Sequence, residues 1–249
     1  MNNKLLLKIL GCMCFIAIMA SCKKVTEVPV PAQAQNRILS YKITNVQGNP
    51  IEGVVNDDAK TIKVYLPYYY YLTALEPEIK VSEGATITPA TGTIVDDLLD
   101  VFDNGRDIKY NVTAKDGTKA TYTLQLIVQQ GNFELEELSP SATEITELTY
   151  GTKNGSADLY LSVSGDFPSG NTELDRQLIK ITLTAQDGSE YVIDNNRGAK
   201  LFAGTNFVYF VLSSSAAPGL NSGTYKVKVR FYSKTVSLKN PIKITITQQ

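Results

Sequence analysis

The chain has 249 residues, a formal net charge of −1, and neither histidine nor tryptophan. All three cysteines (Cys12, Cys14 and Cys22) and all three methionines lie in the segment that ends at Cys22. If the residues before Cys22 are removed, the remaining chain has a single cysteine, at its own first position. This composition excludes histidine-based catalysis, a cysteine nucleophile in a folded site, Cys/His zinc centres and internal disulfides. The near-neutral charge gives no argument for a nucleic-acid partner.

The N-terminal segment has the pattern of a secretory signal. Lys4 and Lys8 precede an apolar run from Ile9 to Ala20. This run is about 12 residues long, whereas a bilayer-spanning helix needs ~20. We therefore predict a signal peptide rather than a transmembrane helix.

The end of this segment, Met19-Ala20-Ser21-Cys22, resembles the bacterial lipobox, in which small residues precede a cysteine that is lipidated and becomes the new N-terminus. The resemblance implies a signal peptide over residues 1–21, lipidation of Cys22 and a membrane anchor. Residues 23–36, rich in Pro, Ala and Gln, continue from Cys22 as a flexible tether, so residues 22–36 should not be part of a folded domain.

Beyond the tether, short alternating or β-branched runs bounded by Gly, Pro, Asn and Asp predict strands, and no stretch shows a sustained helical period. The predicted strands are Ile38–Val46, Thr61–Leu66, Glu78–Ser82, Ile108–Ala114, Thr121–Gln129, Leu159–Ser164, Leu178–Ala185, Tyr191–Asp194, Phe207–Leu212, Thr224–Tyr232 and Pro241–Thr247. Strands at this density without intervening helices are typical of β-sandwiches.

The sequence divides best at Gln129-Gln130-Gly131-Asn132, directly after a long predicted strand. This division predicts one sandwich over residues 37–130 and a second over residues 131–249, each of ordinary domain size. The expected fold class is therefore all-β, with two tandem β-sandwich domains after the signal peptide and the short tether.

Six segments of the first half carry a resemblance to a known family: Ile38–Ile43, Thr61–Pro67, Leu75–Ile79, Gly84–Thr93, Tyr110–Thr118 and Tyr122-Thr123. They resemble a family of immunoglobulin-like domains found in lipoproteins of Bacteroidetes bacteria, which implies that the two tandem β-sandwich domains are immunoglobulin-like. The second half is similar to such sandwiches only in general terms, for instance through Ser222–Val229.

The resemblance implies a protein of the outer membrane that is exposed at the cell surface and works near a polysaccharide-uptake system. Its implied partners are the membrane, a glycan, and outer-membrane uptake or adhesion proteins. Lipoproteins exported to the surface in this group tend to carry acidic residues after the lipidated cysteine, whereas Lys23 and Lys24 follow Cys22 here. A folded part that faces the periplasm is therefore an open alternative.

Four consecutive tyrosines, Tyr68, Tyr69, Tyr70 and Tyr71, are the most unusual feature of the first half. They follow Pro67, where the preceding strand should end. Neighbouring residues in a strand point to opposite faces, so at least some of these rings should be exposed. A tyrosine ring can stack on a sugar while its hydroxyl bonds the sugar's edge, which makes the four tyrosines a candidate ligand-binding site. The alternative is that the rings pack between the two sandwiches or cap the first core.

An acidic cluster follows in the segment 94–110. Its members are Asp96, Asp97, Asp100, Asp103 and Asp107. Several carboxylates in a loop can bind calcium, but the spacing does not match a known calcium loop. The apolar residues between the acids favour one amphipathic turn with a solvated acidic face, so we predict no metal site and no cofactor.

No acid or serine of the chain sits in a catalytic motif, and we predict that the protein is not an enzyme. Two functional hypotheses stay open at this point. One is a lipid-anchored, surface glycan-binding accessory of a polysaccharide-uptake system. The other is a structural, adhesion or fimbria-related spacer that works through protein–protein contacts, for which exposed edge strands would be suitable.

Overall fold

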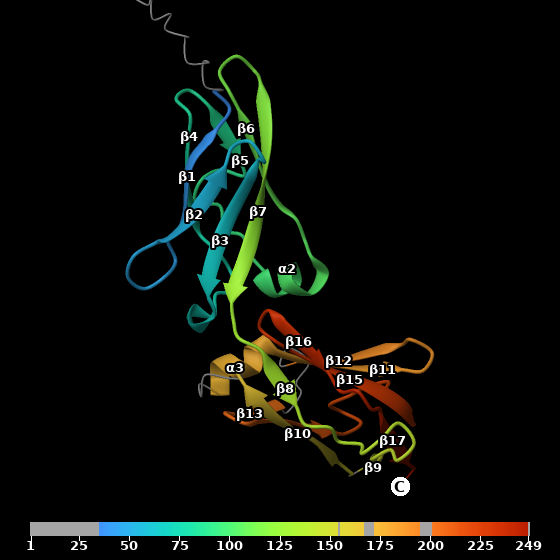
Figure 1. The fold of residues 1–249 in the computed structure, drawn as a ribbon. Coiled ribbons are helices and arrows are strands. Elements are labelled where there is room, and N and C mark those ends of the chain that lie inside the picture. The colour runs from blue at the N-terminus through green and yellow to red at the C-terminus, as the bar shows by residue number, and fades with distance from the viewer. Residues whose placement is uncertain (1–34, 154, 167–171, 195–200, 249) are drawn as a thin grey trace, which may run out of the picture. The chain divides into compact units, whose positions relative to one another are not determined.

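A computed structural model describes residues 35–153, 155–166, 172–194 and 201–248 (Figure 1). The predicted signal peptide, Cys22 and nearly all of the predicted tether lie outside the described residues. Residues 35–249 group into one compact unit, in which the buried apolar side chains form two core clusters. We name residues 37–130 the first domain and residues 131–248 the second domain. In the part that the structure describes, no helix is long and apolar enough to cross a bilayer.

The first domain contains a single seven-stranded sheet with the strand order β4-β1-β2-β3-β7-β6-β5. Neighbouring strands are antiparallel except for β3 and β7, which are parallel. The strands are β1 (Ile38–Ile43), β2 (Ile51–Asn56), β3 (Thr61–Pro67), β4 (Pro77–Val81), β5 (Thr86–Thr88), β6 (Ile108–Thr113) and β7 (Lys119–Gln129).

This sheet folds over on itself to enclose a core. β1 and β6 are four positions apart in the strand order, which would separate them by about 19 Å in a flat sheet. The rings of Tyr41 in β1 and Tyr110 in β6 nevertheless lie 5.6 Å apart, and their hydroxyl oxygens are 3.0 Å apart. Burial raises the pKa of both tyrosines, so this buried hydrogen bond joins two neutral hydroxyls. The two ends of the sheet therefore form two layers that face each other.

The second domain contains two sheets. One has the strand order β13-β14-β10-β8, and the other has the order β12-β11-β15-β17-β9 with β16 added beside β15. The strands are β8 (Phe133–Leu135), β9 (Glu147–Gly151), β10 (Ala157–Gly165), β11 (Ile179–Ala185), β12 (Glu190–Asp194), β13 (Leu201–Gly204), β14 (Phe207–Leu212), β15 (Gly223–Phe231), β16 (Lys234–Ser237) and β17 (Ile242–Thr247).

The pairing in the second domain is that of an immunoglobulin fold. In that fold, strands A, B, E and D form one sheet and strands C, F and G form the other. Here β8, β10, β14 and β13 take the places of A, B, E and D, while β11, β15 and β17 take those of C, F and G. The prediction of an all-β chain built from immunoglobulin-like sandwiches is therefore confirmed.

Each predicted strand is present, with its ends shifted by up to a few residues. The short or irregular strands are not predicted from the sequence; they are β2, β5, β8, β9, β13 and β16. The predicted amphipathic turn between the acids is the helix α2 (Leu98–Asn104), whose Leu98 is buried. A second helix, α3 (Thr172–Leu178), was not predicted.

Candidate functional site

The four tyrosines do not extend β3 as a strand. β3 ends at Pro67, and Tyr68–Tyr70 form one turn of 3₁₀ helix, η1. Tyr71 then adopts a left-handed backbone conformation with φ 46°, and its N–H donates to the carbonyl of Tyr68 at 2.8 Å. The expected alternation of these side chains between two faces is therefore wrong, because a helical turn distributes them around its axis instead.

The four rings differ widely in exposure. Tyr71 is 9% exposed, and its ring centroid lies 6.4 Å from that of Phe231 and 6.2 Å from that of Tyr232. Tyr68 and Tyr70 are half-buried, whereas Tyr69 is 62% exposed. Tyr71 is therefore a packed ring, as the alternative to ligand binding predicted. Tyr69 is the ring of the four that is most accessible to a ligand.

The surroundings of Tyr71 are a well-packed core. The hydroxyl of Tyr232 donates to the carbonyl of Leu72 at 2.7 Å, and the ring of Phe102 lies 5.2 Å from that of Tyr232. Burial raises the pKa of Tyr232, so its hydroxyl stays neutral and acts as a hydrogen-bond donor. These contacts hold Tyr71 in place as a structural residue.

The acidic cluster is only partly solvated. Asp103 is bound by the guanidinium of Arg230 at 2.9 Å and by the ammonium of Lys180 at 3.0 Å, and its side chain is 18% exposed. Arg230, itself buried, also donates to the carbonyls of Leu178 and Tyr232. The expectation of a solvated acidic face is therefore wrong for Asp103, because its side chain is largely covered and pairs with two cations.

Three of the other acids of the cluster also have side-chain partners, while Asp96 accepts from Arg106 through its backbone carbonyl. The side chain of Asp97 accepts from the N–H of Asp100 at the start of α2, and Asp100 pairs with Arg106 at 3.1 Å. Asp107 pairs with Lys109 at 2.9 Å. Among the described residues, no three His, Cys, Asp or Glu side chains are grouped so that they could hold a metal ion.

Another charged group lies in the first domain, where Asp57 binds Lys60 at 2.8 Å and Arg37 at 3.1 Å and accepts a short hydrogen bond from Tyr122. Burial alone would raise the pKa of Asp57. The hydrogen bonds from Lys60 and Tyr122 and the charges of Lys60 and Arg37 outweigh it and hold the pKa below its ordinary value. One ionised carboxylate between two cations is a structural clamp and is not the pair of acids that glycoside hydrolysis requires.

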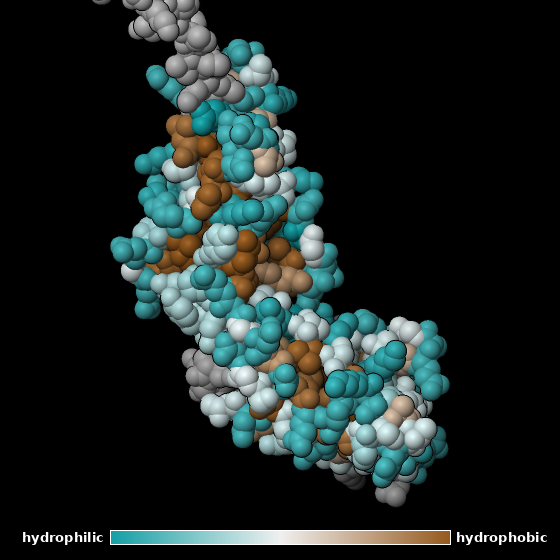
Figure 2. All heavy atoms as spheres, viewed as in Figure 1, coloured by the Kyte–Doolittle hydropathy of each residue, from teal (hydrophilic) through white to brown (hydrophobic). Residues whose placement is uncertain are grey.

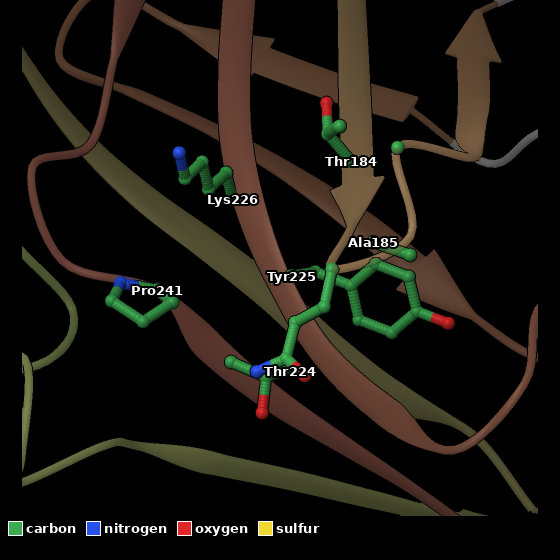
Figure 3. A pocket seen from close by; sticks show the side chains of 8 residues that line it. Thr184, Ala185, Thr224, Tyr225, Lys226 and Pro241 are labelled. Atoms are coloured by element: carbon green, nitrogen blue, oxygen red, sulfur yellow. The ribbon is translucent and has the colours of Figure 1, made fainter.

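A depression of about 420 Å³ lies in the second domain beside β11 and β15 (Figure 3). The residues that line it include Thr184, Thr224, Tyr225, Lys226 and Pro241. The ring of Tyr225 is buried, and its hydroxyl donates to the carbonyl of Asn221 at 2.7 Å. The depression therefore offers hydroxyl and ammonium groups to a ligand but no exposed ring.

Hydropathy alone does not single out a binding surface. Figure 2 shows hydrophilic residues over most of the surface in view, with hydrophobic residues in separate patches. Scattered exposed apolar side chains are ordinary in soluble domains. The type and the arrangement of the exposed side chains are more informative.

One group of exposed aromatic rings lies on the outer face of the sheet that contains β13, β14 and β10. We name it the aromatic face, and its members are Tyr160, Phe202, Phe207 and Tyr209. Tyr160 is 48% exposed and Phe202 is 39% exposed, while Phe207 and Tyr209 are half-buried. The sheet displays these rings outward because their neighbours along the strands, such as Leu161 and Phe210, fill the core on its inner side.

The rings of the aromatic face are nearly parallel to one another. The centroids of Phe202 and Tyr209 lie 4.6 Å apart with 10° between the planes, and those of Tyr160 and Phe207 lie 5.5 Å apart with 18° between them. The pairs Tyr160–Tyr209 and Phe207–Tyr209 are also stacked. The four side chains thus form one contiguous aromatic cluster in which the paired rings cover part of each other's faces, in contrast to the edge-on contacts that Tyr68 makes with Tyr69 and Tyr71.

The aromatic face is not predicted from the sequence. Tyr160, Phe207 and Tyr209 lie in predicted strands, and the spacing of Phe207 and Tyr209 places both on one side of a strand. Phe202 lies in β13, which was not predicted. The rings occupy outward positions of three strands, and these positions come together only when β10, β13 and β14 are paired. The pairing is therefore the information that would have identified the surface.

Residues 38–126 match the family model described as "SGBP, N-terminal". The match covers most of the first domain and none of the second. A comparison with functionally curated proteins gave no significant match.

Among solved structures, a candidate glycoside hydrolase of Bacteroides thetaiotaomicron is 15% identical, with 74% of this chain and 84% of that chain covered and a TM-score of 0.33. The titin fragment A168–A169 is 14% identical, with 86% of each chain covered and a TM-score of 0.28. At these identities and TM-scores, neither likeness supports an inference about function.

The different environments of Tyr71 and Tyr69 predict different effects of truncation. Tyr71→Ala should lower the free energy of unfolding by about 3–5 kcal/mol, because it removes a buried ring from a packed cluster. Tyr69→Ala should change it by less than about 0.5 kcal/mol, because that ring is exposed. Urea unfolding of the two variants measures both values, and equal losses would contradict the assignment of Tyr71 to the core.

Asp103 is predicted to matter far more for stability than its neighbour in the cluster. Asp103→Ala leaves the buried Arg230 without its carboxylate, and breaking a buried pair on one side costs about 3–5 kcal/mol. Asp107→Ala removes an exposed partner of Lys109 and should cost less than about 1 kcal/mol. Thermal unfolding at neutral pH compares the two variants. Similar melting temperatures would show that Asp103 is screened by water after all.

Proposed function

We propose that this chain is a non-catalytic, lipid-anchored glycan-binding protein that serves as an accessory of a polysaccharide-uptake system at the cell surface. The observation that carries the proposal is the match of residues 38–126 to the SGBP N-terminal family, a surface glycan-binding family. The lipobox at Cys22 supplies the anchor, and the tether after it separates the folded domains from the membrane.

The side chains of the folded part support a binding role without catalysis. The chain has no histidine, and no cysteine follows Cys22. The strongest charged groups of the described residues, at Asp57 and Asp103, are carboxylates neutralised by two cations each. A glycan-binding protein needs neither a nucleophile nor a proton donor. It needs exposed rings and hydrogen-bonding groups on a rigid scaffold, and the two sandwiches provide them.

Glycan binding is tested by affinity electrophoresis of the mature chain, from Cys22 to Gln249, in native gels that contain one soluble polysaccharide each. We expect at least one polysaccharide to retard the chain while an unrelated protein of similar size migrates unchanged. Unchanged migration across a broad panel of plant, fungal and bacterial polysaccharides would overturn the glycan-binding proposal and favour a structural or adhesion role.

The anchor is tested with Cys22→Ala. The variant should lose lipid labelling and membrane association, because no other cysteine of the mature chain could be lipidated. Its melting temperature should be that of the unmodified chain, since Cys22 precedes both domains. Labelling with radioactive palmitate followed by membrane fractionation measures the effect. Equal label in variant and wild type would contradict the lipoprotein assignment.

A further inference from the structure

The aromatic face is an unusual surface for a sandwich domain. The outward positions of a half-buried strand normally carry polar residues, and a contiguous exposed apolar patch on a sheet marks an interaction site. β10 follows this rule at Asp158, Ser162 and Ser164 and departs from it at Tyr160. β14 and β13 place further rings beside Tyr160, so the departure is shared by three adjacent strands.

Three of the rings form a row that crosses the strands. Tyr209 in β14 is the register partner of Tyr160 in β10 on one side and of Phe202 in β13 on the other. Strands in a sheet are ~4.8 Å apart, so the row extends over about 10 Å. A six-membered sugar ring is similar in width to an aromatic side chain, and the row is therefore long enough for more than one sugar unit of a chain.

The fourth ring depends on a glycine. Gly204 in β13 is the register partner of Phe207, and a Cβ added at Gly204 would lie 2.4 Å from Cε1 of Phe207. The ring of Phe207 thus occupies the space that a side chain at residue 204 would need. Glycine at this position lets Phe207 lie over β13 and join the aromatic face.

The polar residues beside the rings can hydrogen-bond a sugar and disfavour an anion. Asp158, Ser162 and Ser164 share the outer side of β10 with Tyr160, because residues two apart point the same way. Glu134 in β8 pairs with Ser164 and lies on the same side. Hydroxyls and carboxylates bind the hydroxyl groups of a glycan, whereas two exposed carboxylates repel an acidic chain.

One positive charge beside the rings is already paired. The guanidinium of Arg176 in α3 lies 6.0 Å from the ring centroid of Phe202, and Arg176 pairs with Glu173 at 3.2 Å. This arrangement holds one end of the row by a cation–π contact, and the carboxylate of Glu173 balances the charge of Arg176.

We propose that the aromatic face of the second domain is the glycan-binding site and that it takes an uncharged polysaccharide chain. The inference rests on the proposed function and adds the site and the ligand class to it. It places recognition in the second domain, outside the segment that matches the family model.

The test compares two pairs of variants of the mature chain. Tyr160→Ala combined with Tyr209→Ala should weaken binding of a neutral polysaccharide that the wild type binds by about 10- to 100-fold, since two rings of the cluster and their contacts with the glycan are lost. Tyr65→Ala, which removes an exposed strand tyrosine of the first domain, is the matched control and should change affinity less than about twofold. Gly204→Ala displaces Phe207 without removing any ring and should also weaken binding. Melting temperatures check that each variant is folded.

Ligand class is tested by titrating polygalacturonate beside the neutral polysaccharides at the same ionic strength. We expect polygalacturonate not to bind the wild type, and Asp158→Asn combined with Glu134→Gln to increase its binding. Tighter binding of polygalacturonate than of any neutral chain would overturn the ligand class.

Full affinity of the Tyr160/Tyr209 variant for a neutral polysaccharide would overturn the site while the proposed function stands. If no polysaccharide binds the wild type, the proposed function itself fails. Sedimentation adds one more outcome: a dimer that only the Tyr160/Tyr209 variant abolishes would assign the aromatic face to a second copy of the chain and overturn the inference.

Discussion

The two-residue period of a β-strand is the constraint on which the rest of this protein depends. In β10 and β14, one set of alternate residues fills the core with side chains such as Leu161 and Phe210, and the other set must face outward. Packing of the core therefore does not explain why an aromatic residue occupies an outward position. Tyr160 and Tyr209 are in that set, so their exposure follows from the same pairing that builds the sandwich.

The sequence predicts the long strands well because their alternation is strong. The strands that it does not predict lack this pattern for physical reasons. β2 contains Gly53, where even a Cβ would lie 3.0 Å from the ring of Tyr41, and none of its side chains is fully buried. β5, β8 and β13 have only three or four residues. Such strands are held by their partners, and their own composition carries little signal.

The candidate sites show the same limit. A run of four tyrosines is conspicuous in a sequence, yet η1 turns one of them into a core residue. Tyr160 lies far from the other three rings of the aromatic face in the chain, and none of the four is conspicuous by itself. Strand register brings them together. A sequence can therefore identify unusual local composition, whereas a surface assembled from several strands requires the pairing.

Gly204 illustrates how such a surface is built without loss of stability. A glycine inside a strand costs backbone entropy and contributes no side chain to pack. At residue 204 the ring of Phe207 covers the glycine from the neighbouring strand, so the sheet recovers the missing packing on its outer side. The ring is held there by backbone geometry and needs no contact with the core. A sheet can thus present aromatic side chains on its outer side while its inner side chains are free to satisfy packing.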